Sequence, residues 1–430
     1  MMRQWRRWGR WVVVGFVAAS CLPGVARAES EVDILLDTLV ANGTLTAVQA
    51  GQVRRQITET KEARNKQLAK EIVPDSSRNW KWSGDLRLRD EIRNRVGTGN
   101  DNHRQRIRFR YGFEGKVSDD LTVGARLATG TSTDSGASAE STATNQSLNT
   151  FFVKVPINLD LAYIQYTPEI PGVSKLSVIG GMMQNPLWTV GPMVWDPDLT
   201  WSGAAINLSQ ESGPVTFFTN DGVFSLDTDE TEAAAIWTTQ GGVSVMPFAD
   251  SEDEVLKNFK ITSALSYYDF MNVANSAKAG TDPTTRISTN TALVQDFNEL
   301  IPSFEVLSQV AGVPMSLFGD WVRNVAAGSG SGNGGFQIGV KVGKAKNPWD
   351  LKTGWEAGYF FERLEENAVF DELTDSDFGG GGTNRRGNVW WVTLAVLKHS
   401  TVSAKFFSAK QLTGAKANED RIQLDWMTKF

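Results

Sequence analysis

The fold is decided by two neighbouring stretches, Trp82-Ser-Gly-Asp-Leu-Arg-Leu-Arg89 and Arg104-Gln-Arg-Ile-Arg-Phe-Arg-Tyr-Gly-Phe-Glu-Gly-Lys-Val117. In both stretches apolar and charged side chains alternate, which predicts strands with one apolar and one charged face. The charged face is dense in arginine and the apolar face is dense in aromatic residues. A transmembrane β-barrel, apolar towards lipid and polar towards a water-filled lumen, produces this pattern.

The remaining composition leaves two classes open, a soluble β protein and a membrane barrel. Beyond the N-terminus no apolar run approaches the roughly 20 residues that a membrane helix needs. Barrel strands alternate and therefore leave no such run.

Residues 1–28 are interpreted as a cleaved secretory signal peptide. Arginines between Arg3 and Arg10 precede the short apolar segment Trp11 to Ala19, and Ala26-Arg27-Ala28 is a suitable cleavage site. A lipid-attachment site at Cys21 and a twin-arginine signal at Arg6-Arg7 are weaker interpretations of the same segment.

Cleavage would remove Cys21, the only cysteine, so the mature chain would have no disulfide. It would also remove arginines from a chain whose net charge is already −6. This acidic balance argues against nucleic acid as the partner of the arginine-rich strands.

Residues 29–74 predict a periplasmic helical hairpin. Asn42-Gly43 ends the first helix, Thr46-Ala-Val-Gln49 is a capping box that begins the second, and Pro74 ends that one. The hairpin either packs on itself, or it oligomerises the protein or contacts the cell wall.

Residues 80–430 predict an all-β fold, a transmembrane antiparallel β-barrel of about 16 strands. The strands are expected near residues 80–95, 104–118, 120–130, 158–168, 174–184, 201–211, 213–223, 232–248, 257–270, 296–308, 312–324, 334–346, 349–364, 387–398, 400–411 and 419–430.

The lengths of the connections support this barrel independently. Connections after even-numbered strands are short, at 117–120, 211–213, 346–349 and 398–400, with a longer exception at 248–257. Those after odd-numbered strands are mostly long, at 131–158, 185–200, 271–295 and 365–386. Outer-membrane barrels have short connections at one end and long ones at the other, whereas this alternation is not expected in a soluble β-sandwich.

The last predicted strand, Arg421-Ile-Gln-Leu-Asp-Trp-Met-Thr-Lys-Phe430, alternates and ends on an aromatic residue. It resembles the assembly signal of outer-membrane proteins. We therefore expect the barrel-assembly machinery to recognise the strand that ends at Phe430.

The inward faces of the first two strands provide the candidate pore-lining residues. They are Arg87, Arg89, Arg93, Arg95, Arg104, Arg106, Arg108, Arg110 and Glu114. Guanidinium groups stay charged and bind carboxylate or phosphate in a fork, so they would bias the lumen towards anionic solutes. The alternative is that Asp85, Glu91 and Glu114 pair with these arginines and only brace the barrel.

Two long loops carry further candidates. The loop at 185–200 is apolar and rich in proline; we expect it to fold into the barrel as a constriction, with Trp188 and Trp195 packed inside and Asp196 and Asp198 facing the arginines. A surface loop packed on its neighbours is the alternative. In the loop at 371–384, Asp375, Asp377 and Gly379 are spaced like the start of a calcium loop, but a later bidentate acid is missing, so we expect a plain flexible outer loop.

Aromatic residues on the apolar faces are candidates for the girdles at the membrane interfaces. They are Trp82, Tyr111, Trp349, Trp355, Tyr359, Trp426 and Phe430. The sequence contains few candidate catalytic residues, because the two histidines, His103 and His399, lie near no nucleophile motif or metal-ligand spacing. We expect no enzyme, no cofactor and no metal site.

The chain resembles the putative porins of Gram-negative bacteria over essentially its whole mature length. The pieces that carry the resemblance are Leu35–Thr46, Trp82–Arg89, Arg104–Arg110, Asn185–Trp188 with Val194–Asp198, and Asp375–Asn384. The resemblance implies an outer-membrane location, with contact to lipid and lipopolysaccharide, and passive solute transport. It names no solute. General porins often form trimers, which makes a homotrimer an expectation here.

We therefore expect an outer-membrane porin that passes small polar, preferentially anionic, solutes. The alternatives are a substrate-specific channel for an oxyanion or organic acid, a plugged structural or adhesive barrel, and a soluble secreted β protein.

Overall fold

The computed structural model describes residues 31–72, 79–97, 101–130, 142–148, 154–227, 234–273, 297–328, 330–414 and 417–430. The predicted signal peptide lies outside the described residues. The chain divides into two compact units, Met1–Arg78 and Asn79–Phe430.

The first unit contains two helices, α1 (Glu31–Ala41) and α2 (Ala47–Ile72), where the sequence predicts them. The capping box forms, since the Thr46 N–H donates to Gln49 Oε1 at 2.9 Å and the Gln49 N–H to Thr46 Oγ1 at 3.3 Å. Arg54 pairs with Asp37 at 2.6 Å between the helices. No helix in the described part of the chain combines the length and the apolarity that a membrane crossing requires.

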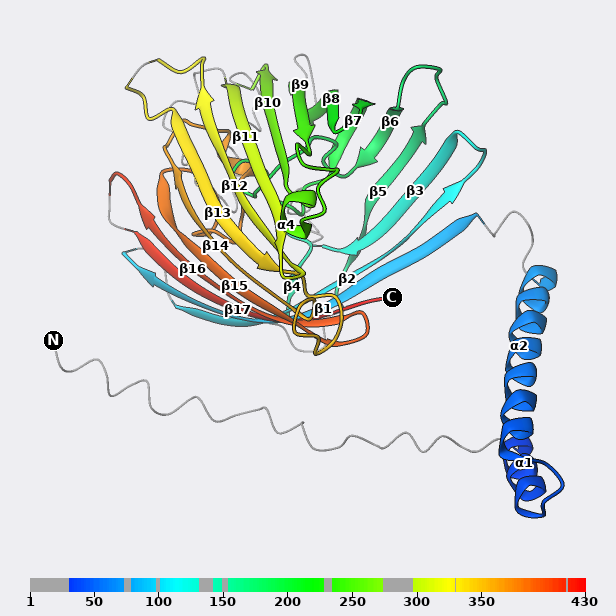
Figure 1. The fold of residues 1–430 in the computed structure, drawn as a ribbon. Coiled ribbons are helices and arrows are strands. Elements are labelled where there is room, and N and C mark those ends of the chain that lie inside the picture. The colour runs from blue at the N-terminus through cyan, green and yellow to red at the C-terminus, as the bar shows by residue number, and fades with distance from the viewer. Residues whose placement is uncertain are drawn as a thin grey trace, which may run out of the picture. The chain divides into compact units, whose positions relative to one another are not determined.

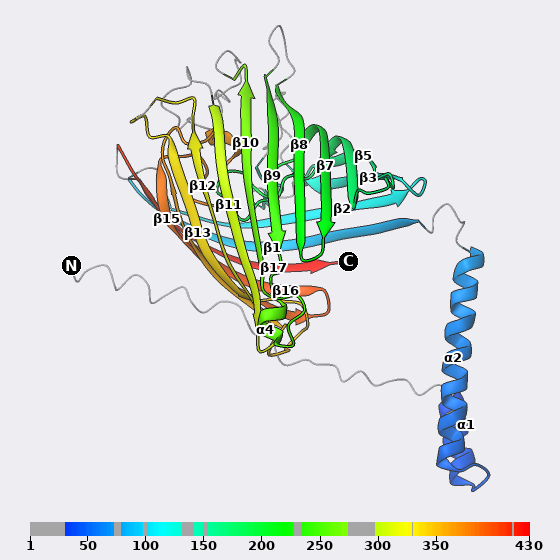
Figure 2. The same ribbon diagram turned by 45° about the horizontal axis from the view of Figure 1, so that its top comes forward.

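The second unit is a closed antiparallel β-barrel (Figures 1 and 2). Its strands are β1 (Trp80–Val96), β2 (Asn102–Lys116), β3 (Leu121–Thr129), β4 (Gln146–Ser147), β5 (Ile157–Tyr166), β6 (Lys175–Met183), β7 (Trp201–Ser212), β8 (Val215–Asp227), β9 (Ala234–Val245), β10 (Lys260–Met271), β11 (Phe297–Val310), β12 (Val313–Asn324), β13 (Gly334–Gly343), β14 (Trp355–Leu364), β15 (Arg385–Leu397), β16 (Ser400–Gln411) and β17 (Asn418–Lys429), with the helical turns α4 (Glu254–Lys257) and η1 (Asp371–Leu373) between strands.

The described sheet has 17 strands, of which β4 is a two-residue segment that pairs with β2. The other 16 strands follow one another around the barrel in chain order, and β17 pairs with β1 to close it. The predicted all-β barrel and its strand number are confirmed, and the soluble alternative loses its support.

The predicted start of one strand, β14, is clearly wrong, whereas the other strand ends differ by at most a few residues. The strand expected from Trp349 begins only at Trp355. Asp350 Oδ1 accepts hydrogen bonds from the backbone N–H groups of Lys352 and Thr353, which holds Trp349–Gly354 in a turn. Trp349 and Leu351 are consequently 76% and 89% exposed instead of alternating within a strand.

The alternation seen in the sequence separates the two faces of the barrel. On β1, Leu88 and Ile92 are exposed on the outer face, while Arg89 and Glu91 are buried on the inner face. Apolar side chains therefore cover the outside, as lipid requires, and the charges point into the barrel.

The C-terminus completes the ring of hydrogen bonds. The Gly84 N–H donates to the Phe430 carbonyl at 2.8 Å, and the Phe430 N–H donates to the Gly84 carbonyl at 3.0 Å. The Phe430 ring lies over Gly84, where a Cβ would come within 2.6 Å of it. Neighbouring Phe109 and Tyr111 have ring centroids 6.3 Å from that of Phe430.

Two connections fold into the barrel, residues 184–200 (the 184–200 loop) and 365–384 (the 365–384 loop). Met193 and Trp195 of the first loop and Val369 of the second belong to one buried cluster with inward side chains such as Tyr268 and Phe270 of β10. Phe378 joins a second cluster with the inward Phe318, Phe360 and Phe407.

The prediction of a plain flexible outer loop at 371–384 is therefore wrong. The apolar side chains of this loop are buried against the inner face of the barrel, so the loop turns inward.

Candidate functional site: the arginine-lined lumen

The eight arginines predicted from the sequence all lie on the inner face of the barrel. Those on β1 are Arg87, Arg89, Arg93 and Arg95, and those on β2 are Arg104, Arg106, Arg108 and Arg110. Glu114 shares this face, where it accepts a hydrogen bond from the Tyr163 hydroxyl at 3.1 Å instead of pairing with an arginine.

The strand register places like charges directly across from each other, Arg87 beside Arg108 and Arg89 beside Arg106. Such neighbours destabilise a sheet unless acids lie within reach. Asp85 accepts from Arg108 at 3.0 Å and from Arg110 at 2.7 Å, and Glu91 accepts from Arg104 at 2.7 Å.

The last strand contributes acids that the sequence analysis did not single out. Asp425 binds Arg89 through two hydrogen bonds of 2.7 and 2.9 Å. Glu419 lies 2.9 Å from Arg95 and 3.3 Å from Arg93. The alternation of Glu419, Arg421, Gln423 and Asp425 along β17 is the signal that could have found them.

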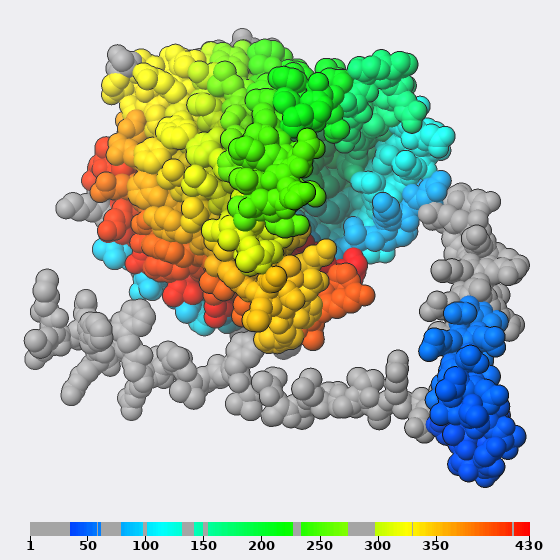
Figure 3. All heavy atoms as spheres, viewed as in Figure 1, coloured from blue at the N-terminus to red at the C-terminus, as the bar shows by residue number. Residues whose placement is uncertain are grey.

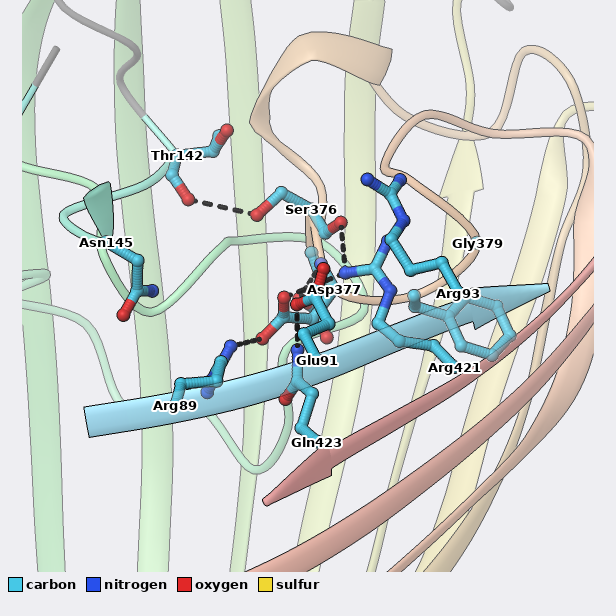
Figure 4. A network of polar contacts seen from close by, with 12 residues as sticks. Arg89, Glu91, Arg93, Thr142, Asn145, Ser376, Asp377, Gly379, Arg421 and Gln423 are labelled. Carbon is cyan, nitrogen blue, oxygen red and sulfur yellow. Dashed lines mark hydrogen bonds and ion pairs between the residues drawn. The ribbon is translucent and has the colours of Figure 1, made fainter. Parts of the chain in front are cut away.

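Asp377, in the 365–384 loop, lies between two of the most buried arginines (Figure 4). Its Oδ2 accepts from Arg89 at 3.0 Å and its Oδ1 accepts from Arg421 at 2.9 Å. Both oxygens are engaged by guanidinium groups, so the calcium-like spacing of Asp375, Asp377 and Gly379 forms no cation site here.

Three connections meet over these arginines. The Ser376 N–H donates to Asp196 Oδ2 at 2.8 Å, and the Ser376 hydroxyl donates to the Thr142 carbonyl at 3.0 Å. Asp198 Oδ2 accepts from the Thr144 hydroxyl at 3.0 Å.

The two acids predicted to face the arginines behave differently. Asp198 Oδ1 lies 3.6 Å from Arg108 Nη1 and 3.9 Å from Arg110 Nη1. Asp196 instead accepts from the backbone of Ser376 and of Asp198. Only Asp198 reaches the arginines.

The acids of these loops have shifted pKa values. Burial, reinforced by the charge of Asp375, raises the pKa of Asp196 to about 8. Burial and the neighbouring Asp377 likewise raise the pKa of Asp375 to about 6. Burial opposes ionisation of Asp377 as well, but Arg89 and Arg421 hold its pKa well below the usual range.

The 184–200 loop is also held by polar contacts to the strands β7 to β9. The Trp188 N–H donates to Gln240 Oε1 at 2.9 Å, the Gln240 amide donates back to the Trp188 carbonyl at 2.8 Å, and the Asn207 amide donates to the Pro186 carbonyl at 2.8 Å. Trp195 packs on Trp201 with a centroid distance of 4.6 Å. Both tryptophans predicted in this loop thus contact the inner surface.

A cavity of ≈ 480 Å³ remains beside these loops. The cations that line it are Arg87, Arg89, Arg106, Arg108, Lys341 and Lys405, and the acids are Asp196, Asp198, Glu305, Glu356, Asp375, Asp377 and Asp425. Arg87 differs from the neighbouring arginines, because its described polar partner is the amide oxygen of Asn145, at 2.5 and 3.1 Å, and not a carboxylate.

The aromatic residues predicted as girdles lie on the outside of the barrel or in its turns. Trp82, Trp426 and Phe430 are exposed on the outer face, Tyr111 stacks near Trp82, and Tyr359 donates to Asn388. Trp355 begins β14, and Trp349 lies in the turn before it.

Comparison with known proteins agrees with this geometry. The family model described as "Putative porin" matches residues 94–307 and 319–430. No curated protein sequence matches the chain.

Solved structures of bacterial porins match this chain, and one of them, OprB, reaches a TM-score above 0.5. The high-pH structure of Pseudomonas putida OprB covers 82% of this chain and 95% of its own, with a TM-score of 0.52 and 14% identity. Salmonella typhi OmpF in complex with daunomycin covers 82% of this chain and 97% of its own, with a TM-score of 0.45 and 12% identity.

A closed barrel with an apolar outside and a charged lumen is thus matched by one family model over most of its length. The chain belongs to the putative porin family, the porins of the Gram-negative outer membrane.

Proposed function

We propose that this porin passes small polar solutes by diffusion, with a preference for anions, through the ≈ 480 Å³ cavity beside the arginines. The observation that carries the preference is Arg87, which borders the cavity and whose described polar partner is a neutral amide. The other arginines are paired with acids, so the bracing alternative accounts for them. Arg87 has no carboxylate at ion-pair distance among the described residues, and Asp198 and Asp425 attract it only from farther away.

Planar-bilayer measurements of reversal potential in a salt gradient test this proposal. Arg87→Gln should reduce the anion preference, and Arg87→Lys should retain much of it because the charge remains. Lys410→Gln is the matched control, since it removes one exposed cation from the outer face of β16. An equal anion preference in wild type and Arg87→Gln would exclude this role for Arg87.

A second candidate is the plugged barrel, which is favoured by the complete burial of Met193 and Val369 inside the lumen. It predicts no conductance in wild type and a conducting barrel once the 365–384 loop is shortened. A channel specific for an oxyanion or organic acid would instead show conductance blocked saturably by that solute.

Assembly as a homotrimer is part of the proposal. Asp221 supports it, because this carboxylate lies at the middle of β8 on the outer face, where it accepts from the Thr239 hydroxyl and is flanked by the exposed Val223. A charge facing lipid at mid-membrane is unfavourable, whereas a contact with another protomer can accommodate it. Light scattering of the detergent-solubilised protein gives the mass, and a monomer would refute this assembly.

The remaining parts of the proposal concern targeting. We infer that residues 1–28 are cleaved on export, that residues 29–74 lie in the periplasm, and that the assembly machinery recognises the strand ending at Phe430. N-terminal sequencing of the mature protein tests the first point, and protease accessibility from the periplasm tests the second.

A further inference from the structure

The inner wall of β12 to β14 carries two acids on either side of an amide. Asp320 of β12 lies directly beside Gln337 of β13, which lies directly beside Glu362 of β14. Their chain neighbours Trp321 and Ile338 are exposed on the outer face, so these three side chains point into the barrel. We call Asp320, Gln337 and Glu362 the acid–amide row. Side chains directly opposite on neighbouring strands lie about 5 Å apart, so the three share one small volume.

The polar atoms of the acid–amide row are buried without partners. Asp320, Gln337 and Glu362 are 4%, 0% and 3% exposed, respectively. Asp320 Oδ1, Glu362 Oε2 and both amide atoms of Gln337 form no hydrogen bond with any described residue. Buried polar groups in native proteins are almost always hydrogen-bonded or bound to an ion, so this row indicates a partner from outside the chain.

The acid–amide row also lacks a counter-ion. Neither carboxylate has an arginine or lysine at ion-pair distance in the described part of the chain. Asp375 adds negative charge near Glu362, and Arg385 attracts Glu362 only from farther away. Lys341, the cation on the same face of β13, lies roughly 13 Å along the strand from Gln337. Two unpaired carboxylates at this depth are costly unless a positive charge joins them.

The acid–amide row is reached from the lumen. Gln337 lines the ≈ 480 Å³ cavity beside the arginines. Gly191 of the 184–200 loop lies against the amide of Gln337, because a Cβ at Gly191 would collide with the amide nitrogen. On the outside, the atoms of β11 to β13, coloured yellow, form a continuous surface (Figure 3). A small ion can therefore enter from the cavity, whereas the loop leaves no room for a larger organic cation.

We propose that the acid–amide row binds a hard divalent cation, of the Ca²⁺ kind. The charge of this ion balances the two carboxylates, and their oxygens and the amide oxygen are the ligands that Ca²⁺ prefers. Bidentate carboxylates and the amide supply about five of the roughly six to eight oxygens that Ca²⁺ takes, and water from the cavity supplies the rest. Mg²⁺ gives up its waters reluctantly and suits a buried site less well.

The composition of the acid–amide row explains why it escapes simpler criteria. In the described part of the chain, no group of three or more histidine, cysteine, aspartate or glutamate side chains is arranged to hold a metal. This row has two such side chains and completes its oxygens with an amide. Its members come from three strands, so no local spacing in the sequence reveals them. The proposal does not depend on which solute passes through the lumen.

Terbium luminescence tests the proposal, because Tb³⁺ replaces Ca²⁺ at oxygen sites and is excited through a nearby indole. Trp391 lines the same cavity as Gln337 and supplies that indole. The full chain is folded in a synthetic detergent, without the membrane lipids that themselves bind divalent cations, and is stripped with EDTA. Titration should show one saturable Tb³⁺ site, from which Ca²⁺ displaces Tb³⁺ more effectively than Mg²⁺ does.

Asp320→Asn and Glu362→Gln should each weaken Tb³⁺ binding by roughly tenfold or more, because each removes one of the two charged ligands. Glu356→Gln is the matched control. It makes the same change on the same face of β14, roughly 20 Å along the strand from Glu362, and should bind Tb³⁺ as wild type does. Heat-modifiable mobility on gels verifies that each barrel is folded.

Gln337→Glu should change the affinity in the opposite direction. A third carboxylate should tighten Tb³⁺ binding by roughly tenfold or more, and it should lower the unfolding temperature in EDTA but not in Ca²⁺. Absence of a saturable site in wild type would overturn the proposal, because the buried acids would then be protonated. Wild-type affinity in both Asp320→Asn and Glu362→Gln would also overturn it, as would weaker binding by Gln337→Glu.

Discussion

At the scale of single residues, Asp377 joins the 365–384 loop to the barrel. Its carboxylate accepts from Arg89 of β1 and from Arg421 of β17. Arg89 and Arg421 each keep another acid without it, Asp425 and Glu419 respectively. The barrel strands therefore do not depend on Asp377, but the position of the loop does.

Asp377→Asn should release the 365–384 loop while leaving the barrel closed. Removing one partner of a buried ion pair costs roughly 3–5 kcal/mol, and here two arginines lose a carboxylate. Limited proteolysis should show faster cleavage within residues 365–384. Asp420→Asn, the same change at an exposed carboxylate on β17, is the control and should cleave at the wild-type rate. Equal protection of both variants would contradict the role of Asp377.

At the scale of elements, the junction of β17 with β1 depends on a glycine. The ring of Phe430 occupies the space where a side chain at position 84 would lie, and the Arg110 carbonyl is as close, at 2.6 Å. The Phe430 ring can therefore occupy this place at the junction of the first and last strands only if residue 84 is a glycine.

Gly84→Val should impair closure of the barrel, since the Cβ would displace the Phe430 ring. The measurement is the fraction of protein that shows heat-modifiable mobility after membrane extraction. Gly180→Val serves as the control, because a Cβ added at this outward glycine of β6 would meet no atom within 4 Å. Normal folding of Gly84→Val would show that the position of the Phe430 ring over residue 84 is not needed for closure of the barrel.

The contact between the 184–200 and 365–384 loops is also an element-scale property, and it should depend on pH. The pKa of Asp196 is raised on folding from the usual value of roughly 4 to about 8. A carboxyl group with a raised pKa binds its proton more tightly in the folded state. The stability that protonated Asp196 contributes to the folded state is complete below the usual pKa of an aspartate and is lost as the pH rises through about 8.

Raising the pH from about 6 to about 9, across the pKa of Asp196, should therefore expose the 365–384 loop to protease. Asp375→Asn removes the nearby carboxylate that contributes to the shift, while its side-chain oxygen can still accept from the Asp377 N–H. This variant should show a smaller increase in cleavage at alkaline pH. Identical pH profiles for wild type and Asp375→Asn would refute repulsion between these acids as the cause.

At the scale of the whole molecule, the barrel is complete within its own unit. Every strand of the ring, including the β1–β17 junction, lies between Asn79 and Phe430. The helices α1 and α2 belong to the other unit, with their own capping box and ion pair.

Deletion of residues 29–78, with the signal segment kept, should leave barrel assembly and thermal unfolding of the barrel unchanged. None of the deleted residues that the structure describes, 31–72, takes part in the ring of backbone hydrogen bonds. Asn79, whose carbonyl accepts from the Lys116 N–H, is kept in the shortened chain. The measurements are heat-modifiable mobility and unfolding followed by circular dichroism at a β-sheet wavelength. Failure of the shortened chain to assemble would show that the helices take part in folding.

The sequence by itself determined the strand number, the strand order and the inward direction of the arginines. These follow from local rules, because a period of two assigns each side chain to a face and short turns join neighbouring strands. The strands expected at 232–248 and 296–308 correspond to β9 and β11. The turn at Trp349–Gly354 was missed because a single side chain, Asp350, overrides the alternation there.

Only the tertiary structure decided which acids neutralise the arginines and where the loops lie. Arg89 meets Asp377 and Asp425 across 288 and 336 positions of the chain, so no local pattern connects them. The inward fold of the 365–384 loop likewise depends on apolar side chains from distant strands, which cover Phe378 and Val369. Closure of the barrel brings these segments together, and it leaves Arg87 without a carboxylate partner among the described residues.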